Sequence, residues 1–231
     1  MKDINKIRYF NFPICLIKEY FNKNYNTLRN IFCYSIYCFV LKKGTSNVEY
    51  AIKEALKYYK VSFNNESALY NDGKELYNSI QRNEALTGIE TSIFWDYQKN
   101  EKTEIEKVVL LAYLSIKSIL GTKTYCKTNK ELLFSRMSGN TKTTNSINNE
   151  LIKHLTRYNF EKIITELKLN WNLKYYSYHT KGFYVSFKLT LEELMTKCEV
   201  NRQSNKIKNL KSKETEIRKK VIQKINNNNS F

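Results

Sequence analysis

The chain has 231 residues and a net charge of +17, from 39 Lys and Arg against 22 Asp and Glu. This length allows one large domain or two small ones. The most apolar run, residues 31–41, is shorter than the roughly 18 residues of a membrane span, so it predicts a buried strand or helix and no membrane partner. The polar N-terminus has no small-residue cleavage site, which predicts no signal peptide.

The cysteines predict a reducing, cytoplasmic location. There are five, at positions 15, 33, 38, 126 and 198, with no close CxxC pair. An odd count without that spacing argues against a disulfide framework and against a zinc site. Free thiols are typical of cytoplasmic proteins.

The positive charge is concentrated in the second half of the chain. Residues 1–120 carry 17 Lys and Arg against 13 Asp and Glu, whereas residues 121–231 carry 22 against 9. Such asymmetry predicts an acidic partner, and nucleic acid is the commonest one because contacts to phosphates release condensed counterions. An acidic protein or an anionic membrane surface would be attracted by the same positive charge. Alternatively, the charge serves only to keep the protein soluble.

The first hundred residues show mixed secondary-structure signals. Apolar residues at helical spacing over 48–59 predict a helix, with Ser46 as its N-cap. Residues 60–63, "KVSF", are typical of a short strand. The "DG" pair at 72–73 predicts a turn between two helical pieces. This region has no motif for chemistry, and we assign it either dimerisation, as a homodimer, or the binding of a second partner.

Two capping-box patterns mark helix starts after residue 100. Thr103 and Glu106 precede an apolar segment that predicts a central helix ending at Gly121. "TYC", residues 124–126, is typical of a short strand. Thr128 and Glu131 repeat the capping pattern for a helix that ends at Gly139.

A pair of amphipathic helices follows. Apolar residues recur every four positions over 147–155, and again on one face over 160–167. The "TRYN" segment between them predicts a turn, with Asn159 as the N-cap of the second helix, which is the pattern of a helix-turn-helix. One continuous helix is the competing interpretation.

An aromatic hairpin follows the helix pair. Residues 171–178 and 182–189 are rich in aromatic and β-branched side chains, and from Phe183 the second segment alternates between apolar and polar residues. His179 to Gly182, "HTKG", predicts the connecting turn, because Gly accepts a positive φ angle. We expect the aromatic stripe to pack into the core and the tip and outer tyrosines to face a ligand.

The order of these elements, over residues 103–190, resembles that of winged-helix DNA-binding proteins of phage and plasmid type. We therefore predict an α+β, helix-rich fold with a winged-helix-like unit and a C-terminal basic helical tail. The expected divisions are a mixed α/β N-terminal region over 1–100, the winged-helix-like unit over 101–195, and a basic helical or partly disordered tail over 196–231.

Enzymatic activity is not predicted. The chain contains no GxxxxGK[ST], GxGxxG or HExxH motif, and its two histidines lack paired spacing. No Ser, Cys or Tyr nucleophile stands near an evident activating partner. We expect neither a cofactor nor a bound metal.

The predicted function is nucleic-acid binding in replication or regulation of a phage or mobile element, with DNA favoured over RNA. One helix would enter the major groove while the tail and the hairpin contact the backbone. Lys153 and Arg157 are expected on the face opposite Leu151 and Leu155, with His154 beside them. The predicted nucleic-acid-binding residues are Asn148, Asn149, Lys153, Arg157, Lys162, Lys168, Lys181, Lys206, Lys208, Lys211, Lys213, Arg218, Lys219 and Lys220.

An alternative function fits the same composition. A small, basic protein without a catalytic constellation is also typical of a phage-encoded inhibitor that occupies a host defence enzyme. An RNA-guided nuclease, or its guide RNA, would be such a target. The partner would then be a host protein or nucleoprotein.

Overall fold

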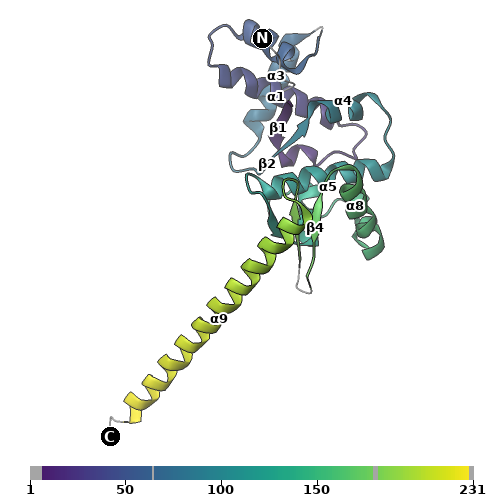
Figure 1. Cartoon of the computed structure of the whole chain (residues 1–231). Helices are drawn as coiled ribbons and strands as arrows, with labels where there is room; N and C mark the ends of the chain where they lie inside the picture. Colours follow the sequence, from purple (N-terminus) through teal and green to yellow (C-terminus); the bar gives the residue numbers. More distant parts are fainter. Residues whose placement is uncertain (1–6, 64, 179–181, 229–231) are drawn as a thin grey trace.

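The structure, a computed structural model of the chain, describes residues 7–63, 65–178 and 182–228, with side chains to residue 223. It is helix-rich with two small antiparallel sheets, which confirms the α+β class. Figure 1 shows the elements gathered into a body from which one long C-terminal helix projects.

The first sheet joins distant parts of the N-terminal region. Strand β1 (Tyr9–Pro13) pairs antiparallel with β2 (Leu86–Glu90), and Phe10 lies opposite Ile89. The Phe10 side chain is fully buried, and its ring forms a T-shaped pair with Phe32 and stacks on Tyr59. The short 3₁₀ helix η1 (Ile14–Ile17) continues from β1 into the core.

Three helices follow: α1 (Thr27–Lys43) packs on β1, and α2 (Val48–Tyr59) and α3 (Glu66–Ser79) pack on α1. Helix α1 contains the apolar run of residues 31–41 and buries side chains on most of its sides, so that run is a helix and not a strand. The N-cap of α2 is Asn47, whose side chain accepts a hydrogen bond from the backbone of Tyr50, so the prediction of Ser46 was wrong.

Two other predictions in this region were wrong. Residues 60–63 do not form a strand, because Lys60 ends α2 in a left-handed conformation with φ of 56°. The "DG" pair does not break the helix, since α3 runs continuously through it. Gly73 is there for packing: a Cβ at this position would lie 2.2 Å from the Cys33 carbonyl oxygen of α1.

Helix α5 (Glu104–Leu120) is the centre of the molecule, as its apolar sequence predicts. It follows α4 (Thr91–Lys99) and buries ten of its side chains between the N-terminal helices and the C-terminal elements. The predicted capping box is present, because Thr103 and Glu106 each bond the backbone of the other. One continuous apolar cluster extends from Phe10 through α5 to Val185.

The second sheet follows α5 in the chain, and its strand β3 packs against that helix. The chain passes from α5 through β3 (Cys126–Thr128), α6 (Lys130–Met137), α7 (Asn149–Ile152), the 3₁₀ turn η2 (Lys153–Leu155) and α8 (Arg157–Asn170). It then forms the hairpin strands β4 (Lys174–Tyr176) and β5 (Phe183–Ser186). The strands lie in the order β3-β5-β4, all antiparallel, so β5 inserts between the hairpin partner and the distant β3.

Two helix caps differ from the predictions. Asn129, rather than Thr128, caps α6, because Thr128 belongs to β3 and lies opposite Phe183. Thr156, rather than Asn159, caps α8. The Asn159 side chain instead donates to the Lys153 carbonyl and fastens the turn before α8. The expected break between two helices is present.

The chain ends in α9 (Leu191–Asn228), which begins at a second reciprocal cap between Thr190 and Glu193. Only its first turns pack on the body, where Leu194 and Cys198 are buried against the hairpin. The described side chains from residue 200 to residue 223 are all exposed, and Figure 1 shows this part of the helix extending away from the other elements.

Candidate nucleic-acid interface

Two predicted site residues lie at the start of α7: Asn148 caps the helix, and Asn149 is exposed. Asn148 caps α7: its Oδ1 accepts from the Glu150 backbone at 3.0 Å, and its Nδ2 donates to the Lys18 carbonyl at 3.5 Å. Asn149 is exposed on the first turn. Asn149 is therefore the one available for contacts to phosphate or base edges.

Lys153 is held by a carboxylate from another helix. Its Nζ lies 2.5 Å from Oε1 of Glu104, and His154 Nε2 lies 3.1 Å from the same oxygen. The bonds to Lys153 and His154 lower the pKa of Glu104 below its usual value. His154 is buried, so it belongs to the wall of the body and not to a surface patch. Glu104 thus neutralises much of the Lys153 charge.

Arg157 begins a different helix from Lys153. The two residues are separated by Thr156, the cap of α8, so they do not share one helical face as predicted. Arg157 Nε lies 2.9 Å from Oε1 of Glu161, one turn further along α8. Both side chains are highly exposed, and such a pair is weak enough to open for another anion.

The rest of α8 presents a mixed face to solvent. The Nζ of Lys162 lies 4.4 Å from the centre of the Tyr158 ring, which is 67% exposed. Lys168 is exposed near the C-terminal end, beside Leu169. A groove of about 790 Å³ runs between α8 and the start of α5. Its lining includes Glu104, Glu161 and Glu166 as well as Lys153 and Lys162, so its charge is nearly balanced.

The hairpin packs as its sequence predicts. Phe183 and Val185 are buried, and Phe183 meets Phe160 of α8 with ring centres 5.7 Å apart. Gly182 has φ of 101°, and a Cβ there would lie 2.4 Å from the Thr128 carbonyl. The absence of a side chain at Gly182 therefore lets β5 pair closely with β3. The predicted site residue Lys181, with His179, lies outside the residues that the structure describes.

The densest group of cations lies on α9. Arg202 pairs with Glu199 at 2.6 Å, whereas the cations from Lys206 to Lys220 are exposed and form no ion pair within the described part of the chain. Between residues 200 and 223 only Glu214 and Glu216 oppose them. The cations predicted to bind nucleic acid here are Lys206, Lys208, Lys211, Lys213, Arg218, Lys219 and Lys220.

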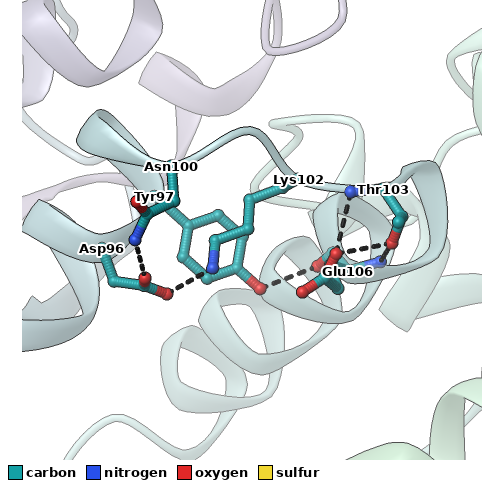
Figure 2. Close-up of polar contacts among 6 residues, drawn as sticks. All are labelled: Asp96, Tyr97, Asn100, Lys102, Thr103 and Glu106. Atoms are coloured by element: carbon teal, nitrogen blue, oxygen red, sulfur yellow. Dashed lines mark hydrogen bonds and ion pairs between the residues drawn. The ribbon is translucent and has the colours of Figure 1, made fainter.

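A polar cluster joins α4 to α5 (Figure 2), and sequence reasoning predicted only its Thr103–Glu106 capping box. Lys102 Nζ lies 2.5 Å from Asp96 Oδ2, and Asn100 donates to the other oxygen at 2.6 Å. The Tyr97 hydroxyl donates to the Glu106 backbone carbonyl at 3.0 Å. The side chain of the same Glu106 accepts from the Thr103 backbone in the helix cap. Every group drawn has a partner, so the cluster is a structural clasp.

The described residues contain no group of three or more His, Cys, Asp or Glu side chains placed to hold a metal ion. Within the same residues, no helix combines the length and the apolarity needed to cross a bilayer. Comparisons with protein-family models, with curated protein sequences and with solved structures found no match to this chain.

Proposed function

We propose that the chain binds nucleic acid, with duplex DNA as the favoured form. The observation that carries the proposal is the charge of α9: eight Lys and Arg against two Glu over residues 200–223, all exposed and held away from the body. A helix rises about 1.5 Å per residue, so this part spans roughly 36 Å of aligned cations. Rigid spacing of that kind suits phosphates, which release counterions when neutralised.

The elements from α5 to β5 support a winged-helix-like unit within this proposal. The strand order β3-β5-β4, with β3 between the first two helices and the hairpin after the third, is compatible with that arrangement. Helix α8 would be the one that enters the major groove, through Arg157, Lys162 and Lys168. The segment between β4 and β5 would contact the flanking backbone.

The test is a salt titration of DNA binding. A fluorescein-labelled duplex of about 20 base pairs is titrated with the full chain at about 50 and 200 mM salt. Six or more phosphate contacts predict a loss of about 10³-fold or more in affinity over this range. Absence of binding at about 50 mM salt, or a flat salt dependence, would refute the proposal. The same titration with duplex RNA separates the two nucleic acids.

A second candidate function has its own observation. Val200, Ile207, Leu210, Ile217 and Val221 recur on α9 at intervals of three, four or seven residues, and each is between 49 and 62% exposed. Such a stripe is typical of a coiled-coil seam. The flanking e and g positions carry Lys206, Lys211, Lys213, Arg218 and Lys220. The matching partner is a protein with an acidic amphipathic helix, as expected for an inhibitor that docks on a host enzyme.

A peptide separates the two candidates. A synthetic acidic helix with Leu at a and d and Glu at e and g is added to the preformed DNA complex. Under the first function the DNA is the tighter ligand, and the peptide displaces it only when in large excess. Under the second, Ile207→Ser with Ile217→Ser abolishes peptide binding and leaves DNA affinity unchanged.

A further inference from the structure

A pocket of about 320 Å³ opens at the junction of the two sheets' ends and is separate from the α8 groove. It lies between the start of β1, the C-terminal half of α5 and the segments that follow α8 and β5. Thr124 and Lys188 stand at its mouth, near Ser186, which donates to the Thr124 carbonyl at 2.7 Å. In the register of β5 this is the end of the sheet remote from the hairpin turn.

Lys117 of α5 lies inside this pocket without a carboxylate partner among the described residues. Its Nζ lies 4.4 Å from the centre of the Tyr9 ring and 5.1 Å from that of Tyr113. Lys102 provides the contrast, since it also lies over a tyrosine ring but reaches Asp96 at 2.5 Å (Figure 2). The Lys117 ammonium therefore depends on two ring faces for stabilisation.

The pocket has a positive field. Lys123 and Lys188 are exposed at its rim, and its lining contains no Asp or Glu. Glu90 acts on Lys117 more weakly than burial does, and burial lowers the Lys117 pKa to about 8. An anion placed beside Nζ would supply the missing partner and would favour the charged form of Lys117.

The remaining wall is aromatic. Tyr113 packs on Trp171 with ring centres 4.4 Å apart and on Phe187 at 5.2 Å. A pocket of this size is at the small end of those that hold organic ligands, so it suits one ring system rather than several. Aromatic side chains stack on any nucleic-acid base because every base has a π-face.

We propose that this pocket binds a nucleoside phosphate, with its base on the Tyr113–Trp171 wall and its phosphate at Lys117, Lys123 and Lys188. The ligand is either a free mononucleotide or the terminal nucleotide of a single strand. Both present one base and one phosphate. The site uses Trp171, the C-cap of α8, but none of the cations of α8 or α9, so it can be tested separately from the function proposed above.

The test uses AMP, adenosine and inorganic phosphate as probes, measured by calorimetry on the full chain near pH 7. AMP binds most tightly, because only AMP engages both the rings and the lysines. Lys117→Met, which keeps an unbranched side chain one atom shorter and removes the charge, weakens AMP binding at least tenfold. Lys102→Met is the matched control and leaves AMP affinity within about twofold, since that lysine serves the α4–α5 clasp.

Two further measurements keep the proposal open to refutation. Lys123→Met with Lys188→Met changes only exposed side chains and weakens AMP severalfold even if Lys117→Met fails to fold. A competition experiment identifies the source of the ligand. If the pocket binds strand ends, a 5′-phosphorylated dA10 strand competes with AMP, whereas the same strand with a 5′-hydroxyl does not. If neither strand competes, the ligand is the free mononucleotide.

The pH dependence supplies a readout that a purely structural lysine would lack. Affinity for AMP falls severalfold from pH 7 to 9 as Lys117 loses its proton, whereas Lys117→Met shows no such fall. The phosphate, with a second pKa of about 6, stays doubly charged throughout. Tyr9 and Tyr113 have raised pKa values, Lys123 and Lys188 are the other charged groups that line the pocket, and Glu90 acts on Lys117 from outside the lining. No AMP binding at millimolar concentration, or equal binding by Lys117→Met or by phosphate alone, overturns the proposal.

Discussion

Gly73 marks the closest approach of two helices in the N-terminal half. Its backbone lies against Cys33 and Tyr37 of α1, and a Cβ would fall 2.2 Å from the Cys33 carbonyl oxygen. In an exposed helix, replacing Gly by Ala stabilises a protein by about 0.4–1 kcal/mol. Here the overlap is with backbone, so relief requires α1 and α3 to separate.

Gly73→Ala is therefore expected to lower the free energy of unfolding by about 2 kcal/mol or more, in the range of an overpacked core. Urea unfolding followed by circular dichroism measures this change. Lys74→Ala, the exposed neighbour on α3, is the control and shifts stability by less than about 0.5 kcal/mol. A Gly73→Ala protein as stable as the original would show that α1 and α3 do not touch at this point.

Glu104 gives the molecule one source of acid sensitivity. Its pKa is lowered in the folded state by Lys153 first and His154 second. A depressed folded pKa stabilises the protein above the unfolded value, which is about 4.3 for Glu, and this stabilisation is lost as pH falls through the folded value. The melting temperature of Glu104→Gln should therefore fall less than that of the original chain between pH 5 and 3. Parallel curves for the two proteins contradict the assignment.

Helix caps were harder to predict than helices. Thr128 satisfies the sequence pattern for a cap, yet its backbone pairs with β5 and passes the capping position to Asn129. Likewise Thr156 takes the cap of α8 that Asn159 also matched. The observed cap lies one residue from the predicted one in α6 and three residues from it in α8. Several adjacent polar side chains can cap a helix, and the surrounding packing selects one of them.

At the scale of elements, α8 and η2 share the predicted recognition residues unevenly. Lys153 and Arg157 each have a carboxylate within 3 Å, whereas Lys162 lies over a tyrosine ring and Lys168 is exposed. Breaking an existing ion pair offsets part of the free energy that the cation gains by binding a phosphate. Lys162→Ala with Lys168→Ala should thus weaken DNA binding about tenfold and more than Lys153→Ala with Arg157→Ala does.

Fluorescence anisotropy at about 50 mM salt measures this difference. Lys53→Ala with Lys57→Ala removes two exposed charges from α2, on the N-terminal half of the chain, and is the charge-matched control. Equal losses for all three pairs would mean that binding follows net charge alone. α8 would then have no role as a reading helix.

The exposed part of α9 is predicted to be separable from the body. Beyond residue 200 its described contacts with the rest of the molecule include the hydrogen bond of Asn201 to the Tyr125 hydroxyl and the Arg202 guanidinium 4.9 Å from the centre of the Tyr178 ring. Truncation after Val200 should shift the melting temperature by less than about 2 °C, because about 1 kcal/mol moves a domain of this size by roughly 2–4 °C. DNA affinity should fall for specific and random duplexes by similar factors, and the salt slope should flatten. A truncated protein that melts early with its salt slope intact would reverse this assignment.

For the whole molecule, charge and the apolar stripe of α9 make opposite demands on assembly. Two parallel copies of α9 would place Lys206 against Lys211 and Lys213 against Arg218 across the seam, and antiparallel copies also bring cations together. The chain is thus expected to be a monomer at about 0.1 M salt and to associate weakly at about 1 M, where charges are screened within about 3 Å.

Sedimentation equilibrium over that salt range measures the association. Salt should weaken DNA binding and strengthen self-association, because it screens both the phosphate contacts and the repulsion between the charges that flank the stripe. Ile207→Ser with Ile217→Ser removes the seam and should abolish the association while the salt slope for DNA remains. A stable dimer at low salt would show that α9 pairs in a way that these positions do not describe.

Local patterns in the sequence were sufficient for the helix-rich α+β class, the central helix α5 with its capping box, the break before α8 and the buried face of the hairpin. Each follows from periodicity or from a side chain bonding its own neighbourhood, which needs only nearby residues. Tertiary structure alone decided that Gly73 is a helix contact and not a turn and that Glu104 forms an ion pair with Lys153. It also decided that Lys117 lies beside two rings with no carboxylate partner among the described residues. These depend on residues tens of positions apart in the chain, which the packing of α1 on α3 and of α5 on its neighbours brings together.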